Sequence, residues 1–145
     1  MNFLFDANCN PRLIDVVRNV VAGHVFEDLR VTHPHADEPV WMPEVASRPE
    51  PWVVISGDKA RFRKPAELIV LKRYPMTWVG LMGTYIHAGF DEQARRLAEA
   101  WPSLVRKIEG QKEHWVYKIK QDPLHRNPQR QRRVIVERYR RIAEL

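Results

Sequence analysis

The chain has 145 residues, of which 44% are hydrophobic and 29% charged, and this size fits one domain with its own core. Five Trp, five Phe and four Tyr exclude a disordered chain, and the one cysteine excludes a disulfide framework or a cysteine-rich zinc module. No signal-peptide pattern and no apolar run of membrane length are visible, so we expect a soluble cytoplasmic protein with no membrane contact.

The net charge of +6 lies in the last 35 residues of the chain. Residues 1–110 hold 14 Lys and Arg against 14 Asp and Glu, whereas residues 111–145 hold 10 against 4. A basic tail on a neutral body is typical of a polyanionic partner, either nucleic acid or an acidic protein surface. A solvated helix that keeps the protein soluble explains the same composition.

Apolar runs and helical periodicity divide the chain into alternating strands and helices. In chain order, we predict a strand at 2–6, a helix from Asn10-Pro11 to Gly23, a strand at 24–26, an irregular loop at 28–39, a short helix at 37–46, a strand at 52–56, a helix at 65–73, a strand at 76–82, a helix at 90–108, an alternating edge strand at 114–120, a linker at 123–128 and a basic helix at 129–145. Solid apolar strands that alternate with helices indicate a parallel sheet covered on both faces, so the fold class is α/β.

Acids follow two of the predicted strands. Asp6 ends the first apolar run, and Asp58 follows the run at 52–56 after Gly57. Ligands of open α/β sheets bind at the carboxyl ends of the strands, where these carboxylates converge if the two strands are neighbours. Asp37 starts the helix between them and can point to the same edge. Clustered carboxylates repel unless a cation neutralises them, and Mg²⁺ or Mn²⁺ suits oxygen ligands and assists phosphodiester hydrolysis.

Each of these acids also has a plain structural explanation as the cap of a helix, and the residues alone leave both interpretations open. Directly after Asp58 come four basic residues, Lys59, Arg61, Arg63 and Lys64. They form either a cluster that positions phosphates or an exposed basic loop. Glu67 either pairs with Arg63 or Lys64 or joins the acid site.

Three weaker patterns lie in the same region. His33, His35 and Asp37 have a spacing compatible with zinc, but no second ligand pair accompanies them. The segment from Asp6 to Asn8 is close to an aspartyl-phosphate phosphatase pattern, but it lacks the second Asp. Cys9 has no nearby His to activate it, which favours a packing role.

Three segments together resemble the PIN-like domain family, in particular its branch of VapC-like toxins. They read FLFDANCNPRLIDVV, HADEPVWMPEVA and PWVVISGDKARFRKPAEL. The first resembles the family's opening strand, Asp, loop and Pro-Arg-Leu helix. The second resembles the intervening acid pair and helix, and the third a strand that runs into an Asp followed by basic residues. The resemblance covers about residues 1–82.

The resemblance implies a three-layer α/β/α PIN-like domain with a mostly parallel central sheet over residues 1–120, followed by a basic linker and helix over residues 121–145. It implies a metal-dependent ribonuclease that hydrolyses RNA with Mg²⁺ or Mn²⁺ and acts as the toxin of a toxin–antitoxin pair. RNA, a cognate antitoxin and a second copy of the chain are the expected partners.

Carried over by position, the resemblance makes Asp6, Asp37 and Asp58 the catalytic metal ligands. Asn8 supports the site by orienting a water, and Glu38 competes with Asp37 for the middle position. The family usually has a further acid late in the chain, and Asp91 and Asp122 do not match its context here. This departure keeps a second hypothesis open, namely a non-catalytic RNA- or protein-binding module with the same fold. A phosphatase is the third.

Overall fold

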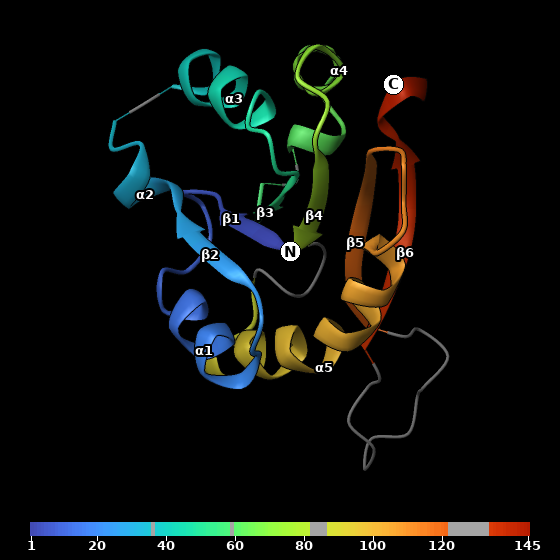
Figure 1. Cartoon of the computed structure of the whole chain (residues 1–145). Coiled ribbons are helices and arrows are strands. Elements are labelled where there is room, and N and C mark those ends of the chain that lie inside the picture. The colour runs from blue at the N-terminus through green and yellow to red at the C-terminus, as the bar shows by residue number, and fades with distance from the viewer. Residues whose placement is uncertain (36, 59, 82–86, 122–133) are drawn as a thin grey trace.

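Within the residues that the structure describes, six strands form one mixed, mostly parallel sheet. The computed structural model describes residues 1–35, 37–58, 60–81, 87–121 and 134–145. The strands are β1 (Asn2–Phe5), β2 (Val25–Asp28), β3 (Trp52–Ser56), β4 (Thr77–Leu81), β5 (Trp115–Gln121) and β6 (Val134–Arg141). Their order across the sheet is β2-β1-β3-β4-β5-β6, and only β6 runs antiparallel to its neighbour (Figure 1).

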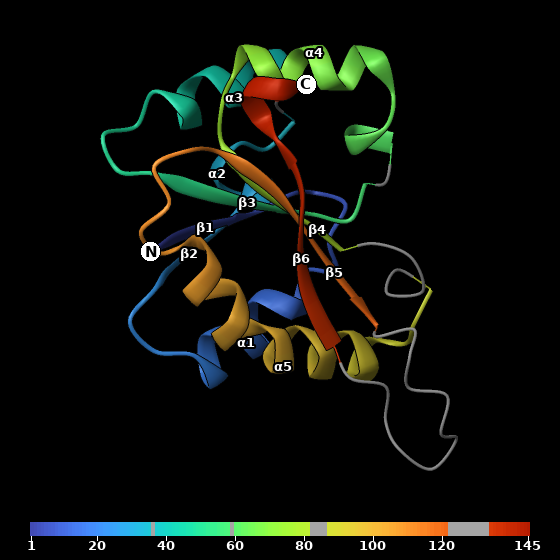
Figure 2. The ribbon, with the colours of Figure 1, turned by 90° about the vertical axis from the view of Figure 1, so that its right-hand side faces the viewer.

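Helices lie between the strands along the chain and cover both faces of the sheet. They are α1 (Arg12–Val20), α2 (Leu29–Thr32), α3 (Glu38–Ala46), α4 (Pro65–Arg73) and α5 (Phe90–Ile108), with short 3₁₀ turns η1 (Ala60–Phe62) and η3 (Ile142–Glu144). Figures 1 and 2 show α1 and α5 against one face and α3 and α4 against the other. None of the described helices is long and apolar enough to cross a membrane.

Alternate residues of each strand feed two separate hydrophobic cores. Phe3 and Phe5 point into the core under α1 and α5, whereas Leu4 and Val54 point into the core under α3 and α4. Because helices cover both faces, every residue of β3 and β4 is buried. This double burial explains why these strands are continuous apolar runs in the sequence.

The predicted α/β class and most of the predicted elements are confirmed. The helices expected at 65–73 and 90–108 have these bounds in the structure, and the helix expected at 37–46 starts one residue later. The segment at 28–39 is not wholly irregular, because Asp28 Oδ1 accepts a hydrogen bond from Arg30 N (3.0 Å) and caps α2. The predicted linker at 123–128 lies outside the described residues.

The prediction of a C-terminal helix is wrong, because residues 134–141 form β6. The β-branched residues at the start of this segment favour a strand, and alternate ones, Val134 and Val136, are buried in the core under α5. The backbone N–H of Val134 also donates to Glu99 of α5 (3.1 Å). As a consequence β5 is not an edge strand, since it lies between β4 and β6.

The direction of strand order changes at β1. The chain passes from β1 through α1 to β2 on one side, and β3 lies on the other side of β1. Beyond the carboxyl ends of β1 and β3, the chain leads to helices on opposite faces of the sheet, α1 after β1 and α4 after β3 (Figure 1). This is the place at which open α/β sheets bind ligands.

Candidate functional site

Neighbouring strands bring Asp6 and Asp58 to the same edge of the sheet. β1 pairs with β3 in parallel, with Phe5 opposite Ile55. Asp6 follows β1 directly, and its backbone N–H donates to the carbonyl of Ile55 (2.9 Å). Asp58 follows β3 by two residues. The two strands that the acids follow are therefore neighbours, as the hypothesis of converging carboxylates requires.

The Asp6 carboxylate is buried and held by three hydrogen-bond donors. Only 4% of the residue is exposed. Its Oδ1 accepts from the backbone N–H of Ala7 (2.7 Å), and its Oδ2 accepts from Ser56 Oγ (2.9 Å) and Asn8 Nδ2 (3.2 Å). A buried charge needs such partners, because burial without them is costly. The three donors fix the direction in which the carboxylate points.

Asn8 links the segments that follow β1 and β3. Its Nδ2 donates to Asp6, and its Oδ1 accepts from the backbone N–H of Gly57 (2.8 Å). The two segments approach closely here, since a Cβ on Gly57 would lie 3.2 Å from the carbonyl oxygen of Asn8. Ser56 completes the link, because its Oγ also accepts from the backbone N–H of Asp58 (3.2 Å).

Arg61 lies among three carboxylates from three different parts of the chain. Its side chain is 5% exposed, and its Nη2 lies 3.4 Å from Asp6 Oδ2 and forms an ion pair with Glu38. Its Nη1 lies 3.9 Å from Glu67 Oε2, and its guanidinium carbon lies 5.1 Å from the ring centroid of Trp78. One positive charge against three negative charges leaves this cluster with a formal charge of −2.

The structure brings together only part of the predicted site. Glu38, rather than Asp37, lies next to the Asp6 and Arg61 pair. Asp37 is exposed at the N-cap of α3, where its side chain makes no capping hydrogen bond and its backbone carbonyl accepts from Val40 N (2.9 Å). Asp58 is half-buried beyond β3.

The predicted basic cluster does not behave as one group. Arg61 is buried against acids, whereas Arg63 and Lys64 are exposed, and Lys59 lies outside the described residues. Glu67 lies beside Arg61, with its Oε2 3.9 Å from Nη1, and Arg61 is not the Arg63 or Lys64 that the sequence suggested as its partner. Sequence reasoning missed Ser56, and the only signal for it is a polar residue at the end of an apolar run.

The donors at this edge fit a hard cation by chemistry, but they do not form a cage. Within the described ranges, no group of three or more His, Cys, Asp or Glu side chains is arranged to hold a metal ion. Mg²⁺ usually takes one or two carboxylates and keeps several waters, so Asp6 with one further acid is a sufficient donor set. The surplus negative charge, and the buried Glu67 Oε2 that has no hydrogen-bond partner among the described residues, suit a positively charged ligand.

The zinc pattern is not realised. His33 Nε2 pairs with Glu44 Oε2 (2.9 Å), and no metal-binding group includes it among the residues that can be placed.

A polar cavity of about 370 Å³ lies beside the site. Asn8, Pro11, Gly57 and Gln93 line it, together with Cys9. Burial, with Asp6 next to it, raises the pKa of the Cys9 thiol to about 12, and its Sγ donates to the carbonyl of Ile55 (3.3 Å). A thiol in this state is not a nucleophile at neutral pH. Cys9 therefore packs the loop, as the sequence suggested.

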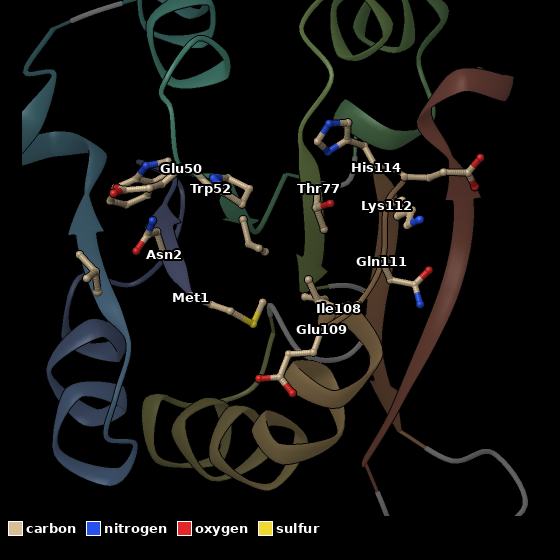
Figure 3. Close-up of a pocket in the computed structure, with 15 residues that line it drawn as sticks. Met1, Asn2, Glu50, Trp52, Thr77, Ile108, Glu109, Gln111, Lys112 and His114 are labelled. Carbon is tan, nitrogen blue, oxygen red and sulfur yellow. The ribbon is translucent and has the colours of Figure 1, made fainter.

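A second cavity, of about 600 Å³, lies at the opposite edge of the sheet (Figure 3). Its lining includes Asn2, Trp52 and Thr77, which are the first residues of β1, β3 and β4, together with Ile108 and His114. It is therefore at the amino ends of the strands and does not include Asp6. Polar and charged side chains such as Glu50, Glu109 and Lys112 also line it, but most of its lining surface is apolar.

Comparison of the chain with protein-family models, with curated proteins and with solved structures gave no match.

Proposed function

We propose that this chain is a metal-dependent ribonuclease with a three-layer α/β/α PIN-like domain, and that it is the toxin of a toxin–antitoxin pair. The observation that carries the proposal is the Asp6 carboxylate, which is buried and held by three donors at the carboxyl end of β1. The toxin assignment rests on the three sequence segments that resemble the family. The antitoxin and a second copy of the chain remain proposed partners.

Asp6 is the residue best placed to hold Mg²⁺ or Mn²⁺, with Glu38 or Asp58 as its companion. Such an ion, when bound, polarises a phosphodiester and lowers the pKa of a coordinated water. The chain's own residues orient the carboxylate: Ser56 and Asn8 both donate to Asp6 Oδ2. A carboxylate held in one direction does not need to reorganise when a substrate arrives, which favours catalysis over a merely capping role.

The surroundings of Asp6 offer places for an RNA strand. The exposed Arg63 and Lys64 follow the site in sequence and can contact phosphates without reading bases. The cavity of about 370 Å³ beside Asn8 and Gly57 is within the size range of small-molecule sites. We propose that this cavity holds one nucleotide of the substrate.

The test is Asp6→Asn, which keeps the shape of the side chain and removes its charge. We expect RNA cleavage in MnCl₂ to fall by about 100-fold or more, with Mn²⁺ binding lost by calorimetry and the circular dichroism spectrum retained. Asp15→Asn, on the exposed side of α1, is the matched control and should leave cleavage unchanged. Unchanged cleavage by Asp6→Asn, purified from a host without contaminating ribonucleases, would exclude the proposed mechanism.

A non-catalytic RNA- or protein-binding module is the second candidate. The ion pair between Arg61 and Asp6 favours it, because the guanidinium lies where a catalytic cation is needed. Calorimetry separates the candidates. A binding module should bind RNA equally well in EDTA and in MnCl₂. Its calorimetric titration with Mn²⁺ should be the same for the parent chain and for Asp6→Asn.

A further inference from the structure

Arg61 is built into the site by the fold and is not a chance surface pair. Its carboxylate neighbours come from three parts of the chain: Asp6 follows β1, Glu38 begins α3 and Glu67 lies in the first turn of α4. The indole of Trp78 in β4 packs below the guanidinium. Four separate parts of the chain must therefore assemble around this one side chain.

The cluster is nevertheless left partly unsatisfied. Arg61 Nε and Nη1 and Glu67 Oε2 are buried, and none of them has a hydrogen-bond partner among the described residues. The gap of 3.9 Å between Nη1 and Oε2 is too long for a hydrogen bond. Native proteins rarely leave buried polar atoms unpaired, so three such atoms in one cluster need an explanation. Glu67 Oε2 is an acceptor that a donor or a cation can satisfy, whereas Arg61 Nε and Nη1 are donors that need an acceptor.

The formal charges of the cluster do not balance. Asp6, Glu38 and Glu67 carry three negative charges and Arg61 carries one positive charge, so two more positive charges make the cluster neutral. We propose that Arg61 is the internal counter-ion of the divalent-cation site. It neutralises the carboxylates of Asp6 and Glu38 when no ion is bound, and it competes with the ion for their oxygens. This inference rests on the proposed function, since it requires a cation at Asp6.

Competition follows from electrostatics at short range. A guanidinium and a divalent cation that share the same carboxylate oxygens repel each other, and the repulsion is strong where water is excluded. Cation binding must therefore weaken the contacts of Arg61 with Asp6 and Glu38. Linkage is reciprocal, so the contacts of Arg61 lower the cation affinity by the same factor by which the bound cation weakens those contacts. Arg61 in this way sets the concentration of free ion at which the site fills.

The experiment is calorimetric titration of the full chain with MnCl₂ at constant ionic strength. We expect Arg61→Gln to bind Mn²⁺ about tenfold more tightly than the parent chain, because it keeps polar contacts and loses the charge. Arg61→Lys keeps the charge and should bind within about threefold of the parent. Arg63→Gln removes an equal charge from the exposed end of the same loop and should have no effect.

The outcomes separate this inference from the proposed function. If Asp6→Asn abolishes Mn²⁺ binding but Arg61→Gln binds Mn²⁺ as tightly as the parent chain or more weakly, the counter-ion role is wrong and the metal site is supported. If neither the parent chain nor Arg61→Gln shows heat that Asp6→Asn removes, both proposals are wrong. If Mn²⁺ binding is detected only in Arg61→Gln, the metal site and the counter-ion role are both supported, because Arg61 then prevents the ion from binding to the parent chain.

A measurement on the parent chain covers the case in which Arg61→Gln does not fold. In a titration with diamagnetic Mg²⁺, the nitrogen and proton resonances of the Arg61 Nε–H group should shift with the same midpoint as the backbone amides of Ala7 and Gly57. The resonances of the Arg61 Nε–H group are assigned by their absence from the spectrum of Arg61→Lys. Backbone amides that shift while the Arg61 Nε–H group stays still would overturn the inference, and no shift at any of these groups would overturn the metal site as well.

Discussion

Ser56 and Asn8 hold Asp6 at one oxygen atom, while the backbone holds the other. The hydroxyl of Ser56 is fully buried, and it also accepts from the backbone N–H of Asp58. It therefore connects the two acids that follow β1 and β3. A residue with this position supports both the folded state and the orientation of the carboxylate.

We expect Ser56→Ala to destabilise the protein by about 1–2 kcal/mol, because Asp6 Oδ2 and the N–H of Asp58 each lose a buried partner. Urea denaturation measures the change in the free energy of unfolding. Ser47→Ala is the control, since its hydroxyl donates to the carbonyl of Glu44 on an exposed helix end and should matter by less than about 0.5 kcal/mol. Equal losses in the two variants would show that Ser56 has no special role.

Glu92, in the first turn of α5, ties the stability of that helix to pH. Hydrogen bonds from Arg95 first, and then from Arg96, lower the pKa of Glu92 to about 2. A carboxylate whose pKa is lower in the folded chain stabilises the fold above its ordinary pKa of 4.5. That contribution is lost as the pH falls from 4.5 towards about 2.

We expect Glu92→Gln to cost about 1 kcal/mol at pH 7, a value reduced for the solvent exposure of this side chain. The difference from the parent chain should shrink as the pH falls below 4.5 and be nearly absent at pH 2. Urea denaturation at a series of pH values measures it. A difference that stays constant with pH would mean that the ion pairs of Glu92 do not contribute.

At the scale of elements, β6 is the part of the fold that the sequence did not predict. Val136 of β6 lies opposite Ile119 of β5 and is 6% exposed. We expect Val136→Ala to destabilise the protein by about 2 kcal/mol through lost burial and a small cavity. Arg140→Ala on the same strand is exposed and should change stability by less than about 0.5 kcal/mol.

A helix over the same residues would reverse this expectation, because alanine favours helices and valine does not. Chemical denaturation therefore distinguishes the two structures. A neutral or stabilising Val136→Ala would contradict the strand.

The sequence predicted those elements whose burial leaves a clear pattern. β3 is buried at all its residues and appears as a solid apolar run, and α5 shows a clear helical stripe. β6 has only three consecutive apolar residues before its arginines, and so short a stretch fits a helix or a strand. The partner that decides between them, β5, pairs with it across the sheet and is not visible in local sequence.

The same limit applies to the site. Asp6 and Asp58 could be placed together, because parallel neighbouring strands end at the same edge. The positions of Arg61 and Glu38 could not, because they depend on how η1 and α3 pack above that edge. A basic residue that follows an acid along the chain reads as a phosphate contact, and only the packing shows that it is buried among acids.

At the scale of the whole molecule, the surplus of negative charge at the site and the surplus of positive charge lie in different parts of the chain. The cluster around Arg61 has a surplus of negative charge, whereas residues 111–145 hold 10 basic residues against 4 acidic ones. Within that segment Lys120 and Arg141 pair with acids, while Arg138 and Arg140 are exposed on β6 and pack over the rings of Trp115 and Tyr139. Exposed arginines on aromatic rings are a surface suited to RNA phosphates and bases.

We expect the double variant Arg138→Ser, Arg140→Ser to weaken binding of single-stranded RNA by a similar factor for every sequence tested. The slope of log affinity against log salt concentration should fall by about 1.4, as two lost phosphate contacts require. Fluorescence anisotropy in EDTA over a range of NaCl concentrations measures both effects without cleavage. Lys72→Ser, Arg73→Ser removes the same charge from α4 and should leave the slope nearly unchanged, because these residues lie on another element. If the two double variants lose the same RNA affinity, binding depends on the net charge of the protein alone and β6 is not the binding surface.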